Sequence, residues 1–138
     1  MDTKSECTGA RTIDCRGPIC VVDDDELIRC SVTTLLHSMD FDAYCFAGAK
    51  EFLESELVDA CVCLISDVKM KKMSGFMLYQ ALTSSGKKIP VIFISGHADE
   101  QMRKKAADIG AEALLDKPFN DHALLRLVEK ILASRRPS

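Results

Sequence analysis

The chain has 138 residues, a net charge of −3 and an isoelectric point near 5.6. This length suits one domain with a real hydrophobic core, and the slightly acidic balance predicts neither direct nucleic-acid binding nor membrane attachment. No apolar run approaches membrane-spanning length and residues 1–16 lack the apolar core of an export signal, so we expect a cytoplasmic protein.

Seven cysteines are spread through the chain without any C-x-x-C pair. The odd count and the missing export signal favour reduced thiols that pack as small hydrophobes over a disulfide or a structural metal site. Cys61 and Cys63 lie two residues apart on a predicted strand, so we expect them to share one face and to point into the core.

The chain begins with a polar stretch, residues 1–17, that shows no periodicity and predicts a flexible N-terminal tail. Short apolar segments then alternate with amphipathic ones. The apolar segments predict strands, in chain order, at 19–22, 41–46, 61–67, 89–94 and 113–115. The amphipathic segments predict helices at 27–39, 48–57, 76–85, 99–109 and 121–134. We therefore expect one domain over 18–134, followed by a C-terminal tail or linker stub at 135–138.

Strands that alternate with helices through short connections are expected to be parallel, with right-handed crossovers. The first, third and fourth predicted strands are apolar throughout, which is typical of strands buried on both faces. The sequence therefore predicts a single α/β domain, a doubly wound five-stranded parallel sheet with helices on both faces.

Polar residues that could take part in binding or catalysis follow four of these strands. The first strand ends at Asp23 and Asp24, the third at Asp67, the fourth at Ser95 and the fifth at Lys117. Because parallel strands end at the same edge of a sheet, we expect these five side chains to converge where ligands bind in such folds.

Three carboxylates at one place repel one another, and a divalent cation would relieve the repulsion. Oxygen ligands with few dedicated protein groups suit Mg²⁺. With Lys117 and Ser95 available to bind phosphoryl oxygens, Asp67 is a candidate nucleophile that forms an aspartyl phosphate.

Four stretches follow one another along the chain: Val21-Val22-Asp23-Asp24-Asp25-Glu26, Ile65-Ser66-Asp67 with Met73-Ser74-Gly75, Ile92-Phe93-Ile94-Ser95-Gly96-His97, and Asp116-Lys117-Pro118-Phe119. In this order and spacing they resemble the receiver domain of bacterial two-component response regulators, the CheY-like fold, over about residues 18–133. The residues of the second and third stretches are most similar to those of FixJ-like receivers. The resemblance implies the strand order 2-1-3-4-5.

The resemblance also implies that Asp67 accepts a phosphoryl group from a phosphohistidine on a sensor histidine kinase. Mg²⁺ would be held by Asp23, Asp24 and Asp67, with Asp24 and Asp67 as the expected direct ligands, and by the backbone carbonyl of Lys69. Such a domain is a phosphorelay switch that catalyses only its own phosphorylation and dephosphorylation, and otherwise is not an enzyme.

Further positions carry implied roles around the phosphoryl group. Ser95 takes the place of the family's switch hydroxyl. The side chain of Lys117 would contact the phosphoryl group, and the peptide bond between Lys117 and Pro118 is expected to be cis. Gly96 leaves the site open. His97, together with Lys69, would tune dephosphorylation by water.

Two positions depart from the family pattern. Lys71, followed by Lys72, stands where the family usually has proline, which predicts a more mobile loop and an altered kinase choice. Leu114 stands where the family often has a rotating Tyr or Phe, so we expect weaker or altered output coupling. The output face would be 99–134, which would bind a downstream protein, an effector domain or a second copy of the chain.

Two other functions remain open at this stage. A degenerate receiver could serve as a phosphorylation-independent binding module, although the five intact site residues oppose this. A haloacid-dehalogenase-like phosphatase also uses a strand-end Asp, but that family has a second Asp two residues later, where this chain has Lys69.

Overall fold

The computed structural model describes residues 17–135, so the tails expected at 1–17 and 135–138 fall almost wholly outside the described residues. Within them, five strands form one parallel sheet in the order β2-β1-β3-β4-β5. The strands are β1 (Ile19–Val22), β2 (Ala43–Phe46), β3 (Cys63–Asp67), β4 (Val91–Ser95) and β5 (Ala113–Asp116). The predicted fold class and strand order are confirmed.

The registers of the parallel pairs bring the strand ends level with one another. Val22 of β1 pairs with Ser66 of β3, Asp67 pairs with Ile94, and Ser95 pairs with Asp116. Every residue of β1, β3 and β4 is buried, as continuous apolar strands at the centre of a sheet require.

Helices connect the strands and begin at polar caps. The helical elements are α2 (Glu26–Ser38), α3 (Ala49–Leu53), the 3₁₀ helix η2 (Glu56–Asp59), α4 (Gly75–Ser84), α5 (Glu100–Asp108) and α6 (Asp121–Arg135). Asp25, Ser74, Asp99 and Asn120 each accept backbone N–H bonds in the first turn that follows them. No helix among the described residues is long and apolar enough to cross a membrane.

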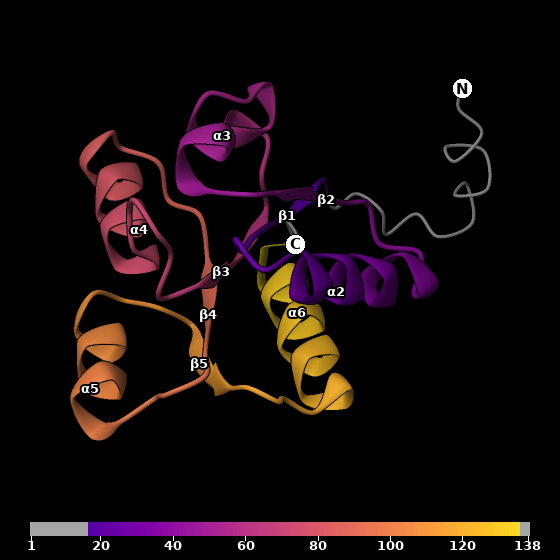
Figure 1. Ribbon diagram of the computed structural model, residues 1–138. Helices are drawn as coiled ribbons and strands as arrows, with labels where there is room; N and C mark the ends of the chain where they lie inside the picture. Colours follow the sequence, from indigo (N-terminus) through magenta and orange to yellow (C-terminus); the bar gives the residue numbers. More distant parts are fainter. Residues whose placement is uncertain (1–16, 136–138) are drawn as a thin grey trace.

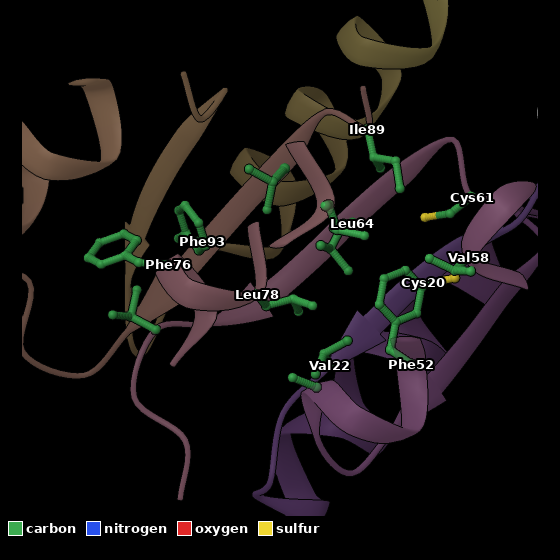
Figure 2. Close-up of a cluster of buried hydrophobic side chains, with 14 of the residues drawn as sticks. Cys20, Val22, Phe52, Val58, Cys61, Leu64, Phe76, Leu78, Ile89 and Phe93 are labelled. Atoms are coloured by element: carbon green, nitrogen blue, oxygen red, sulfur yellow. The ribbon is translucent and has the colours of Figure 1, made fainter. Parts of the chain in front are cut away.

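The helices form two layers, one on each face of the sheet (Figure 1). Helices α3, α4 and α5 cover one face, whose cluster of buried side chains includes Phe52, Leu78 and Phe93 (Figure 2). Helices α2 and α6 cover the other, where Leu36 and Leu124 pack on the opposite strand faces. Burial of these two apolar layers is the main driving force that holds the sheet.

Two expectations about local structure were wrong. The helix expected over 48–57 is a short helix, α3, followed by a separate 3₁₀ turn, η2, which Ser55 caps. The third strand begins at Cys63 and not at residue 61, so strand alternation does not extend to Cys61. Cys61 therefore packs with Cys20 on the α3–α4–α5 face (Figure 2). Cys63 packs on the α2–α6 face.

Candidate functional site

The candidate site lies at the carboxyl edge of the sheet, where the central strands end. Asp23 directly follows β1, Asp67 closes β3, Ser95 closes β4 and Lys117 directly follows β5. Asp23, Asp67 and Ser95 are buried, with 1%, 6% and 2% of their surfaces exposed. Such burial of two carboxylates requires compensating partners, because an isolated buried charge is costly.

Three carboxylates meet at this edge. One oxygen each of Asp23, Asp24 and Asp67 lies within 4.8 Å of the others. Asp23 and Asp67 are buried, whereas Asp24 is exposed. The convergence of these side chains, predicted from the strand order, is therefore confirmed.

Lys117 provides the positive charge for this cluster. Its Nζ lies 3.5 Å from Asp23 Oδ2 and 3.5 Å from Asp67 Oδ1. One ammonium thus lies between two buried carboxylates, so it offsets only part of their charge.

The pKa values of the two buried carboxyl groups show how the site affects their ionisation. Burial, followed by the neighbouring charge of Asp23, raises the pKa of Asp67 to about 6, although Lys117 acts in the opposite direction. Burial is also the largest cause that raises the pKa of Asp23. Both shifts mean that the fold favours the protonated forms of these two carboxyl groups, mainly because they are buried.

The donor set fits a hard divalent cation. Asp23 Oδ2 is buried and accepts no hydrogen bond from any described residue, and its nearest cation, Lys117 Nζ, is 3.5 Å away, so this oxygen is available to a metal ion. Three carboxylates with exposure on the Asp24 side match the preference of Mg²⁺ for a few protein oxygens together with water. Asp23, Asp24 and Asp67 are therefore the residues that could hold it.

Asp23 is held from two sides. Its Oδ1 accepts the N–H of Asp25 at 2.9 Å, and its backbone carbonyl accepts a bond from Arg29 Nη1 at 2.9 Å. Arg29, one turn into α2, did not stand out in the sequence. An arginine six residues after a strand-end aspartate was the only available signal.

The end of β3 is closely packed by the start of α4. A Cβ at Gly75 would lie 2.3 Å from the carbonyl oxygen of Asp67, and the Gly75 N–H donates to Val68 O at 2.8 Å. The Ser66 hydroxyl donates to the same Asp67 carbonyl at 2.9 Å. A side chain at residue 75 would displace the backbone that carries Asp67, so glycine is required there.

Ser95 and Lys117 are joined through the backbone. The Lys117 N–H donates to Ser95 O at 2.8 Å, and the bond between Lys117 and Pro118 is cis. The Ser95 hydroxyl accepts the N–H of His97 at 3.1 Å. The backbone of the residue that carries the ammonium is therefore bonded directly to the end of β4.

The other residues with expected roles around the phosphoryl group differ in their exposure. His97 is exposed, and a Cβ at Gly96 would meet nothing within 4 Å, so this side of the site is open. Leu114 is half-buried against the α3–α4–α5 face. Lys69 is exposed in the loop after β3, and the role of its carbonyl as a metal ligand stays a prediction.

The loop that follows β3 is tied to the acidic cluster. The N–H of Lys71 donates to Asp24 Oδ2 at 3.1 Å. A proline at residue 71 could not make this bond, because it has no N–H. The departure noted at this position therefore adds a contact to the site.

Comparison with known proteins agrees with this geometry. A family model described as the response regulator receiver domain matches residues 19–129. The chain belongs to this family. Receiver domains are phosphoacceptor signalling domains of two-component systems, they work with sensor kinases and effector domains, and they generally bind Mg²⁺ in an acidic pocket such as the one formed here.

Named relatives are response regulators. The chain is 40% identical over 116 residues to the transcriptional regulatory protein TdiR of Thauera aromatica, covering 84% of this chain and 51% of TdiR. It is 37% identical over 126 residues to the response regulator TodT of Pseudomonas putida, covering 91% of this chain and 56% of TodT. The chain therefore spans about half the length of these curated relatives.

Solved receiver structures share its fold. FixJ-N superposes with a TM-score of 0.78 at 29% identity, covering 88% of this chain and 97% of FixJ-N. A receiver protein from Pseudoalteromonas atlantica gives a TM-score of 0.80 at 26% identity, covering 86% of this chain and 99% of that one. The resemblance to CheY-like and FixJ-like receivers is confirmed.

Proposed function

We propose that this receiver accepts a phosphoryl group on Asp67 from a phosphohistidine of a sensor histidine kinase. The observation that carries the proposal is the position of the Asp67 carboxylate, with Lys117 Nζ at 3.5 Å and two further carboxylates beside it. Asp67 closes a buried central strand, so its backbone is fixed while its side chain faces the carboxyl edge.

In the transfer step an oxygen of the ionised Asp67 carboxylate attacks the phosphorus atom. The P–N bond of the phosphohistidine breaks, its electron pair returns to the imidazole nitrogen, and Asp67 becomes an acyl phosphate. Lys117 neutralises one phosphoryl oxygen and the Ser95 hydroxyl donates to another. Mg²⁺, held by Asp23, Asp24, Asp67 and the Lys69 carbonyl, would neutralise the remaining charge. The domain then catalyses only its own phosphorylation and dephosphorylation.

The proposed output follows from the attraction of Ser95 and Lys117 toward the new phosphoryl group. Because the backbones of these residues are hydrogen-bonded to each other, their loops move together and bias the face formed by α5, β5 and α6. This face would bind an effector domain, a separate protein or a second copy of the chain, in the cytoplasm. TdiR is a transcriptional regulator, so transcription control by a longer protein is our proposed output.

The direct test is phosphorylation by acetyl phosphate with Mg²⁺, followed by intact-mass spectrometry. We expect one added phosphoryl group on the wild type and none on Asp67→Asn. The same-sized change Asp121→Asn, at an exposed residue in the first turn of α6, should leave phosphorylation intact. Equal labelling of wild type and Asp67→Asn would reject Asp67 as the acceptor.

A further inference from the structure

The three carboxylates of the acidic cluster are fixed in different ways. Asp67 is buried at the end of β3, and Asp23 is buried, with hydrogen bonds to its side chain and its carbonyl. Asp24 is exposed and receives no comparable support from packing. An exposed carboxylate samples several rotamers, and its ordering on metal binding would cost free energy.

One contact restrains Asp24. The backbone N–H of Lys71 donates to Asp24 Oδ2 at 3.1 Å across a separation of 47 residues. The bond joins the loop after β1 to the loop after β3, which also contains Lys69. It occupies one carboxylate oxygen and leaves the other available to a cation.

We infer that the backbone N–H of Lys71 is a positioning group for a divalent cation, and that it holds Asp24 in the orientation in which the cluster binds metal. The inference rests on the metal site in the proposed function. The contribution comes from the backbone, so the exposed Lys71 ammonium is dispensable and any residue except proline can supply the bond.

The chain offers a matched set of variants for a test. Lys71→Ala removes the ammonium and keeps the N–H, whereas Lys71→Pro removes both. Lys72 is the adjacent loop residue, and its N–H donates no hydrogen bond to any described residue. Lys72→Pro therefore places the same ring in the same loop without the loss of a bond.

The first measurement is the dissociation constant for MgCl₂ by isothermal titration calorimetry. We expect Lys71→Pro to bind roughly three- to tenfold more weakly than Lys71→Ala, a loss in the range of one ordinary intramolecular hydrogen bond, because Asp24 is exposed to solvent. Lys72→Pro should match Lys72→Ala. Equal affinities of Lys71→Pro and Lys71→Ala, or an equal loss in Lys72→Pro, would overturn the inference while the metal site stands.

The second measurement needs no metal. In the metal-free protein the Lys71 amide should exchange with solvent more slowly than the Lys72 amide, and Asp24→Ala should remove that difference. Urea unfolding of the proline variants checks that each remains folded. Exchange of the Lys71 amide that does not respond to Asp24→Ala would overturn the inference. Failure of the wild type to bind Mg²⁺ would instead overturn the metal site itself.

Discussion

At the scale of single residues, Asp67 is held in an environment that opposes its charge. In the unfolded chain it ionises near a pKa of 3.8, whereas burial and the charge of Asp23 raise this pKa to about 6 in the fold. The folded state therefore holds the proton more tightly. Proton binding by Asp67 therefore stabilises the fold. This stabilisation is fully present below pH 4 and is lost as the pH rises through 6.

This linkage predicts a pH-dependent effect of Asp67→Asn, which cannot ionise. In EDTA at pH 7.5, D67N should unfold with a free energy higher than that of the wild type by roughly 3 kcal/mol, since the pKa is raised from 3.8 to about 6 and one pKa unit corresponds to about 1.4 kcal/mol. At pH 4 the two proteins should be similar. Urea unfolding at both pH values measures the difference, and a constant difference would contradict the assigned cause.

Two residues on the rim, Lys69 and His97, should control the lifetime of the phosphoryl group. Both are exposed beside the acidic site and can affect the approach of water. We expect alanine at either position to change the decay rate of the aspartyl phosphate severalfold while phosphorylation persists. Decay is followed by intact-mass spectrometry after removal of acetyl phosphate.

The control for this experiment is Lys130→Ala, an exposed lysine in the second half of α6. Helix α6 begins near the carboxyl edge and runs away from it, so Lys130 lies far along the helix from the site. Its replacement should leave the decay rate unchanged. Equal rates in all four proteins would show that the rim residues do not affect the reaction.

At the scale of elements, the contact between β3 and α4 fixes the position of Asp67. A methyl group at Gly75 would meet the Asp67 carbonyl at 2.3 Å, and that neighbour is backbone, which cannot rotate away. We expect Gly75→Ala to destabilise the protein by about 1–3 kcal/mol, a typical cost of overpacking, and to slow phosphorylation because Asp67 is displaced.

Gly96→Ala supplies the comparison for Gly75→Ala. It adds the same methyl group at the same edge of the sheet, but into open space. Its unfolding free energy should stay within about 0.5 kcal/mol of the wild type, as for ordinary surface changes. Urea unfolding of both variants decides the point, and equal destabilisation would show that close approach to Asp67 is not the cause.

At the scale of the whole molecule, the predicted switch must carry a signal from the site to the face of α5, β5 and α6. Leu114 of β5 is half-buried against the α3–α4–α5 face and pairs in register with Phe93. An aliphatic side chain has no aromatic ring to exchange between buried and exposed positions. The signal would therefore depend on Ser95 and the connected backbone of Lys117.

We accordingly expect phosphorylation to cause only small changes around residues 95–115. Amide chemical shifts of the wild type, with and without acetyl phosphate, measure this directly. Leu114→Tyr restores an aromatic ring at the same position and should enlarge the changes. Large shifts in the wild type itself would refute weakened coupling.

The sequence alone determined the architecture and which side chains meet at the carboxyl edge of the sheet. Continuous apolar runs predicted buried central strands, and the polar residues that close them predicted the convergence of Asp23, Asp24, Asp67 and Lys117. Both inferences depend on local patterns, because strand period, helix period and parallel connection are encoded within short segments. The sequence did not predict that Cys61 and Cys63 lie on opposite faces of the sheet, since strand ends are poorly defined by sequence.

Only the tertiary structure decided how the converging groups are held. The close approach of Gly75 to Asp67, the bond from Arg29 to Asp23 and the bond from Lys71 to Asp24 are set by where loops and helices meet the sheet. The last of these joins residues 47 positions apart, and no local pattern encodes such a contact. Lys71, a mere departure from a familiar pattern in the sequence, is in the fold a backbone donor to the acidic cluster.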